Sequence, residues 1–192
     1  YFKGKAALWN DVIHRSTNAA WAQARDVTQH LTNIHAAVLT VGGWFDAEDL
    51  SGTLKTYRAT ERMNPGIYNG LVMGPWSHGQ WHGDGDKLGP IDFRSNTAEH
   101  FRHEIELPFF RRFLKGATNT ELAEAYVFET GTHRWRRESA WPPTNVVNRT
   151  LFLREDGRLA FEPSPDAGEA FDEYVSDPMR PVPSTTRITP GM

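Results

Sequence analysis

Two short apolar segments, residues 36–41 and 70–74, constrain the fold of this chain more than any other feature. Each is followed by a glycine-rich or proline-containing turn, and each has the length and composition of a strand buried on both faces of a sheet. Leu50, Leu54 and Tyr57 recur between them at helical spacing. Strand, helix and strand in this order predict a right-handed crossover within a parallel sheet. The sequence therefore predicts an α/β fold.

Asp46 and His78 each come shortly after one of these predicted strands. The carboxyl ends of neighbouring parallel strands share one edge of the sheet, which is where open α/β folds bind their ligands. We therefore expect the two side chains to meet above that edge. In a serine-type hydrolase, the Asp orients the His and stabilises its imidazolium while the His takes the proton of the nucleophile. Asp before His fits the last two positions of the α/β-hydrolase order, in which the Ser comes first.

The segments around Asp46 and His78 resemble one family of serine hydrolases. The first reads Val-Gly-Gly-Trp-Phe-Asp-Ala-Glu-Asp from residue 41, and the second reads Gly-Pro-Trp-Ser-His from residue 74. Both are similar to segments of the family that groups cocaine esterase, α-amino acid ester hydrolases, enzymes named glutaryl-7-ACA acylase, and X-Pro dipeptidyl peptidases. Later parts of the chain resemble the same family, at residues 108–116, 127–131, 135, 141–143, 151–157 and 177–183.

The resemblance implies that Asp46 and His78 are the catalytic acid and base of such an enzyme. The family's nucleophilic serine stands in a Gly-x-Ser-x-Gly elbow, and that pattern does not occur in these 192 residues. By resemblance it should lie upstream of Tyr1, together with part of the oxyanion hole. Ser77 is adjacent to His78 and cannot easily fold back onto its ring, and Ser51 stands at the start of the predicted helix. The chain alone is therefore expected to be inactive.

Glu48 and Asp49 directly follow the predicted catalytic acid. In the α-amino acid ester hydrolases, two acids at this place join a third in a carboxylate cluster that holds the substrate's α-ammonium group through charge-assisted hydrogen bonds. The resemblance therefore implies α-amino esters, or β-lactam compounds with an α-amino acyl group, as substrates. Two simpler interpretations stay open. Glu48 and Asp49 are also the acids that a helix dipole favours in a first turn, and Asp46 could act only as an N-cap.

His78, His82, Asp84 and Asp86 form a string of residue types that can bind a metal ion. This spacing alone is weak evidence for a metal site, and the glycines among these residues disfavour a helix that would place the ligands on one face. We therefore predict neither a metal ion nor a cofactor.

The chain changes character near residues 115–119. Before this point candidate helices alternate with strands, and after it come short alternating segments separated by Pro, Gly, Asp and Asn. We predict the end of a helical cap over residues 1–33, the C-terminal portion of an α/β-hydrolase domain over 34–116, and the start of an incomplete jelly-roll β-sandwich over 117–192. A helix is predicted around residues 101–113, with a kink at Pro108.

Charge and composition exclude several other classes of protein. A formal net charge of -3 with scattered Lys and Arg argues against nucleic acid as a partner, and no apolar run approaches the length of a membrane span. The absence of cysteine fits a cytoplasmic, periplasmic or secreted protein equally well, so the compartment stays open. The expected partner is a small-molecule ester or amide, and homo-oligomerisation is left open. The alternative functions are an X-Pro dipeptidyl peptidase and a β-sandwich binding module without catalysis.

Overall fold

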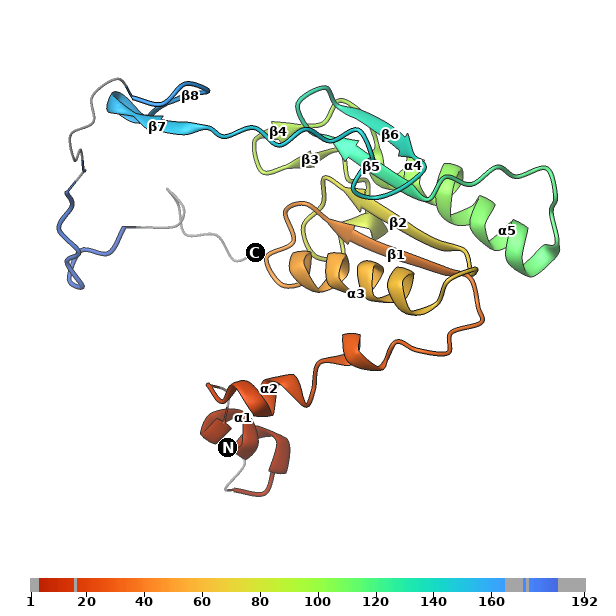
Figure 1. Cartoon of the computed structure of the whole chain (residues 1–192), viewed down its shortest axis with the longest axis horizontal. Coiled ribbons are helices and arrows are strands. Elements are labelled where there is room, and N and C mark those ends of the chain that lie inside the picture. The colour runs from red at the N-terminus through yellow and green to blue at the C-terminus, as the bar shows by residue number, and fades with distance from the viewer. Residues whose placement is uncertain (1–3, 16, 165–170, 172, 183–192) are drawn as a thin grey trace. The chain divides into compact units, whose positions relative to one another are not determined.

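The computed structural model describes residues 4–15, 17–164, 171 and 173–182. The chain forms two compact units, Tyr1–Trp141 and Pro142–Met192, which are described separately. The first unit is built around a four-stranded sheet with the order β1-β2-β5-β6 (Figure 1). Its strands are β1 (Val38–Gly43), β2 (Asn69–Gly74), β5 (Ala125–Glu129) and β6 (Arg134–Glu138).

The predicted strand–helix–strand unit is confirmed. Strands β1 and β2 are parallel, and helix α3 (Leu50–Met63) connects them. Strand β5 is parallel to β2 on its other side, and β6 runs antiparallel to β5. Every residue of β2 is buried, as expected of a central strand with neighbours on both edges and helices on both faces.

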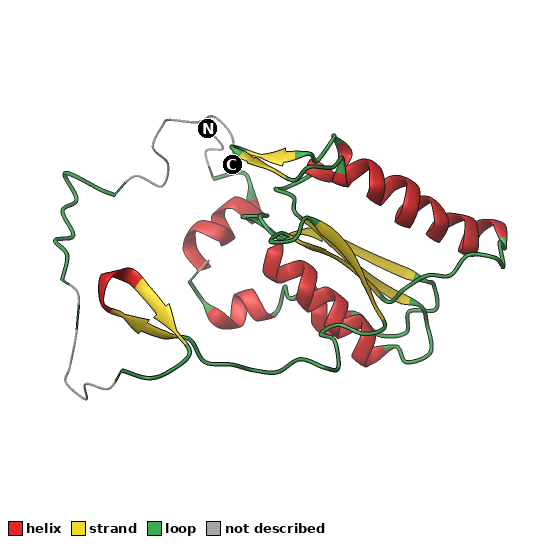
Figure 2. Cartoon of the chain, turned by 90° about the horizontal axis from the view of Figure 1, so that it is seen from above, coloured by secondary structure: helices red, strands yellow, loops and turns green. Residues whose placement is uncertain are grey.

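The two faces of the sheet carry separate cores. Leu71 and Met73 pack on one face with Tyr57 of α3, whereas Val72 packs on the other face with Trp76 and residues from the segment 97–115. This division follows from the period of two in a strand, which points successive side chains to opposite faces. Figure 2 shows a helix on either side of the strands. Burial of each large apolar side chain stabilises the fold by roughly 1.5–3 kcal/mol.

A continuous helical segment covers the second face. It comprises α4 (Thr97–His100), a π-helical stretch (Phe101–Glu106) and α5 (Leu107–Lys115), and Gly116 ends it in a left-handed conformation with φ 68°. Pro108 was expected to kink this helix. Pro108 is the second residue of α5 and follows the end of the π-helical stretch, where the N–H of Leu107 bonds to the carbonyl of Arg102. A wider turn relieves the clash between a proline ring and the carbonyl four residues earlier.

The N-terminal part consists of short helical elements joined by turns. It contains α1 (Ala7–Arg15), α2 (Ala19–Gln23) and a 3-10 turn (Val27–His30). The carboxylate of Asp26 accepts hydrogen bonds from the N–H and hydroxyl of Thr28, so it caps a new turn in place of continuing the old helix. Asp is well suited to this competing role.

The central sheet includes strands that lie beyond the predicted domain boundary at residue 116. Strands β5 and β6, which the sequence assigned to the β-sandwich region of residues 117–192, pair with β2 in the central sheet. The compact unit that contains this sheet is Tyr1–Trp141. The short alternating segments after residue 119 indicated strands, but a short strand pattern does not tell to which sheet a strand belongs.

The second unit contains a hairpin of β7 (Phe152–Arg154) and β8 (Arg158–Ala160), joined by a 3-10 turn (Glu155–Gly157). Residues 171–175 lie in the region that was predicted as the start of a jelly-roll β-sandwich. Residue 172 lies outside the described residues, and residues 171 and 173–175 are not in a strand. The jelly roll is therefore still a prediction. In the described parts of the chain, no helix has the length and apolar character needed to cross a membrane.

Candidate active site

The loops that carry Asp46 and His78 are joined to each other beyond the ends of their strands. Gly43 and Gly74 are register partners at the ends of β1 and β2. The pairing continues past them, because the N–H of Trp44 donates to the Gly74 carbonyl at 2.9 Å and the N–H of Phe45 donates to the Trp76 carbonyl at 3.0 Å. A Cβ at Gly43 would lie 2.1 Å from that Trp76 oxygen, so the close approach of the loops requires glycine there.

This arrangement brings the predicted acid and base into contact. Nδ1 of His78 lies 3.1 Å from Oδ2 of Asp46, a hydrogen-bond distance. The Asp46 side chain is 2% exposed, whereas half of the His78 side chain is open to solvent. The second oxygen of Asp46, Oδ1, accepts hydrogen bonds from the N–H groups of Glu48 at 2.9 Å and Asp49 at 3.0 Å. Both carboxylate oxygens are thus satisfied, and Nε2 of His78 is the ring nitrogen left to face a nucleophile.

The surroundings favour an ionised Asp46 and a basic His78. Burial acts to raise the pKa of Asp46, but the backbone hydrogen bonds from Asp49 and Glu48 and the bond from His78 outweigh it, so the pKa lies below its ordinary value. The hydrogen bond to Asp46 is the largest cause that raises the pKa of His78, and the negative charge of Glu48 adds to it. A buried carboxylate that holds one nitrogen of an exposed imidazole is the arrangement a general base requires.

Glu48 and Asp49 lie beside this pair, and both are exposed. Oδ2 of Asp49 is 3.7 Å from Nδ1 of His78. Asp49 stands at the N-cap position of α3, yet its side chain makes no capping hydrogen bond, and the turn N–H groups bond to Asp46 instead. The carboxylate of Asp49 is therefore not used to cap the helix.

The turn after His78 contributes residues that the sequence did not single out. Gly79 adopts a left-handed conformation with φ 71° and opens a 3-10 turn (Gln80–His82). Oε1 of Gln80 accepts hydrogen bonds from the N–H of Ser77 at 3.0 Å and from its hydroxyl at 3.3 Å. The ring of Trp81 lies edge-on to the His78 ring at 6.3 Å. The only sequence signal for these contacts is the proximity of Gln80 and Trp81 to His78.

One described group has the geometry to hold a metal ion, and it consists of Asp46, Asp49 and His78, whose ligand atoms lie within 4.8 Å of one another. His82, Asp84 and Asp86, the other candidate ligands in the sequence, are not part of this group. The Asp46–His78 hydrogen bond accounts for the closeness of these atoms, and Oδ1 of Asp46 already accepts two backbone N–H groups.

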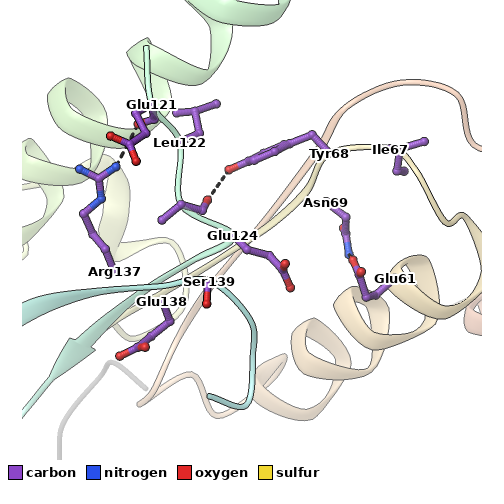
Figure 3. A pocket seen from close by; sticks show the side chains of 11 residues that line it. Glu61, Ile67, Tyr68, Asn69, Glu121, Leu122, Glu124, Arg137, Glu138 and Ser139 are labelled. Atoms are coloured by element: carbon purple, nitrogen blue, oxygen red, sulfur yellow. Dashed lines mark hydrogen bonds between the residues drawn. The ribbon is translucent and has the colours of Figure 1, made fainter. Parts of the chain in front are cut away.

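A hollow of about 550 Å³ lies at the other edge of the sheet, near the start of β2 (Figure 3). The Tyr68 hydroxyl donates to the carbonyl of Ala123 in its wall, and Arg137 donates to the carbonyl of Glu121. Desolvation raises the pKa of Tyr68. The residues that line the hollow include none of the four predicted site residues. Figure 3 shows several carboxylates around it, at Glu61, Glu121, Glu124 and Glu138.

A parallel sheet with an Asp–His pair at its carboxyl edge is typical of the α/β hydrolases. Residues 2–80 match the sequence profile of the X-Pro dipeptidyl-peptidase (S15 family). Among solved structures, an aminopeptidase from a marine sediment archaeon, Thaumarchaeota archaeon, is 36% identical with a TM-score of 0.82, over 96% of this chain and 30% of that one. A selenomethionine-labelled α-amino acid ester hydrolase is 34% identical with a TM-score of 0.81, over 93% of this chain and 31% of that one.

The chain is similar to this S15 family over residues 2–80 and to the two solved structures over most of its own length. It spans 30% and 31% of the lengths of the two solved relatives. A comparison with curated proteins found no match.

Proposed function

We propose that this chain carries the general base and its orienting acid for a serine hydrolase that transfers acyl groups to water. The observation that supports this most is the 3.1 Å contact between the buried Asp46 carboxylate and Nδ1 of the half-exposed His78. The nucleophilic serine would lie upstream in the full-length polypeptide, as the family resemblance implies.

The reaction would follow the two steps of covalent acyl transfer. The serine Oγ attacks the carbonyl carbon of an ester or amide while Nε2 of His78 takes its proton, and His78 then gives this proton to the leaving alcohol or amine. In the second step water attacks the acyl-enzyme, loses its proton to Nε2, and releases the acid as the serine is reprotonated. Asp46 holds the Nδ1–H throughout and stabilises the imidazolium.

Kinetics of the full-length protein test the roles of the pair. Asp46→Asn would present the wrong hydrogen-bonding group to His78, and we expect kcat to fall by about 10⁴-fold, the effect of this change in a serine protease. His78→Ala should lower kcat by at least as much. His82→Ala is the matched control, because His82 is exposed, lies in the same turn and should leave kcat near that of the wild type. Unchanged turnover in Asp46→Asn and His78→Ala would refute the proposal.

For the substrate, we propose an α-amino acyl group whose ammonium is held by Glu48 and Asp49. Both carboxylates are exposed at the site, and among the described residues the carboxylate of Glu48 has no hydrogen-bond partner. Two anions beside the general base would attract a cationic group through charge-assisted hydrogen bonds. One of the solved relatives is named an α-amino acid ester hydrolase, which agrees with this choice.

Glu48→Gln separates this recognition from the chemistry. We expect kcat/KM for an α-amino ester to fall about 10-fold or more, since a hydrogen bond to a charged group contributes roughly 1.5–3 kcal/mol. An acetate ester of the same alcohol, which lacks the ammonium, should be much less affected. Both substrates are measured at one pH at which the α-amino group is protonated, so that a change in the protonation of His78 affects both esters equally. Equal losses for both esters would contradict the ammonium site.

An X-Pro dipeptidyl peptidase is the second candidate, because the matching sequence profile carries that name and one solved relative is an aminopeptidase. It would use the same Asp46–His78 pair on an amide. Comparison of an X-Pro amide with an α-amino ester in the full-length protein distinguishes the two activities. Hydrolysis of neither would favour the binding module without catalysis.

A further inference from the structure

We propose that Arg102 is a positioning residue for the catalytic base, and that it acts through the turn directly after His78. This inference rests on the proposed hydrolase function. Arg102 belongs to the π-helical stretch Phe101–Glu106, which is far from His78 in the sequence and packs on the same face of the sheet as Trp76.

The contacts of Arg102 form a clamp on that turn. Its Nη1 donates to the carbonyl of Trp81 at 2.9 Å and to the carbonyl of Gly83 at 2.8 Å. These two carbonyls lie at and just after the 3-10 turn Gln80–His82. A charged donor shared by two carbonyls binds more strongly than a neutral one and fixes both acceptors in direction. The turn is therefore attached to the helical segment at two points.

The clamped turn carries Trp81, which is the link to His78. The Trp81 ring contacts the His78 ring edge-on at 6.3 Å and the Trp76 ring at 6.1 Å. Trp76 is fully buried, and its Nε1 donates to the hydroxyl of Thr97 at 2.8 Å. The Trp81 ring is thus held between an immobilised indole and the catalytic imidazole.

His78 needs such a second support. Asp46 holds it by a single hydrogen bond at Nδ1, and half of its side chain is exposed. One hydrogen bond allows the ring to tilt about the contact, and a small displacement of a reacting group costs about 10²-fold in rate. The edge of Trp81 limits that tilt, so the Arg102 clamp would keep Nε2 of His78 aimed at the nucleophile.

Arg102→Met in the full-length protein tests the clamp, because it removes the donors and keeps an apolar stem. Groups that orient a functional side chain typically contribute 10–100-fold to activity, so we expect kcat to fall by about 10-fold or more while KM changes little. Arg112→Met is the matched control. Arg112 lies in the same helical segment, and its Nη1 also donates to a backbone carbonyl, that of Thr120 at 2.8 Å. Its kcat should stay near that of the wild type.

The pH profile provides a readout that general destabilisation would not move. The acidic groups that face His78 are Asp46, Glu48 and Asp49, and the hydrogen bond from Asp46 raises its pKa most. A looser ring in Arg102→Met weakens that bond, so the acid limb of kcat/KM should move to lower pH. Arg102→Lys keeps the charge but not the planar fork, and we expect intermediate values. Full wild-type behaviour of Arg102→Lys would show that only the charge matters, and would overturn the clamp.

Trp81→Ala tests whether Arg102 acts through the indole. The double variant with Arg102→Met should lose no more activity than the poorer single variant, whereas additive losses would contradict the route through Trp81. Should Arg102→Met fail to fold, Arg102→Lys and Trp81→Ala decide the matter. A large loss in Asp46→Asn together with an unchanged kcat and pH profile in Arg102→Met would overturn this inference alone. An unchanged Asp46→Asn would instead overturn the hydrolase proposal.

Discussion

At Asp46 the two oxygens of one carboxylate have different partners. Oδ1 accepts the N–H groups of Glu48 and Asp49 and so fixes the loop, while Oδ2 holds the ring of His78. The sequence interpretation offered an N-cap of the helix from Leu50 as the alternative to a catalytic acid. The N-cap position of that helix is Asp49, whereas Asp46 accepts N–H groups that precede the helix. The contact between Asp46 and His78 was predictable because each residue follows the end of a strand, and a parallel sheet brings such positions together. The contribution of Arg102 could not be predicted, since it depends on packing between segments distant in the chain.

The raised pKa of His78 predicts the pH dependence of the proposed reaction. Catalysis needs the neutral ring, so kcat/KM should fall as the pH decreases through a value above about 6.5, the ordinary pKa of histidine. Glu48→Gln removes a negative charge that raises this pKa, so the acid limb should move to lower pH. Profiles of kcat/KM against pH for an acetate ester, for the wild type and Glu48→Gln, check the shift. A limb that stays in place or moves to higher pH would contradict the electrostatic account.

At the scale of elements, features with a local cause were predictable and features with a non-local cause were not. The apolar residues of β2 predicted a buried strand, and all six residues of that strand are buried. For Pro108 the sequence predicted a kink, and the structure has a π-helical stretch directly before α5. The form that such a disturbance takes depends on the packing of surrounding residues, which the local sequence does not determine.

Gly43→Ala tests the connection between β1, β2 and the site. The new Cβ would lie 2.1 Å from the Trp76 carbonyl oxygen, so the loops that carry Asp46 and His78 must separate. We expect a loss of about 2 kcal/mol or more in unfolding free energy, within the range for backbone strain and overpacking, and a fall in kcat. Gly52→Ala is the control, because its Cβ would meet only Asp49 Oδ1 at 3.9 Å. Denaturant unfolding measures both, and equal stability of the two variants would contradict the close approach.

At the scale of the whole molecule, the described part of the chain supplies a sheet edge with an acid and a base. Strands β5 and β6 extend this sheet, so the α/β unit reaches Trp141, further than composition indicated. Composition did not indicate this extent because the residues of a short antiparallel strand are alike in a mixed sheet and in a β-sandwich. The chain spans 30% and 31% of the solved relatives, and the nucleophile is proposed to lie in the rest of the polypeptide.

Labelling of the full-length protein with a serine-directed fluorophosphonate tests the central claim most directly. His78 would activate the nucleophile by taking its proton, so the wild type should incorporate one label, and peptide mapping should find it on a serine upstream of Tyr1. Labelling should be lost in His78→Ala and retained in His82→Ala. A label on Ser51 or Ser77, or undiminished labelling of His78→Ala, would contradict the proposal that Asp46 and His78 serve an upstream serine.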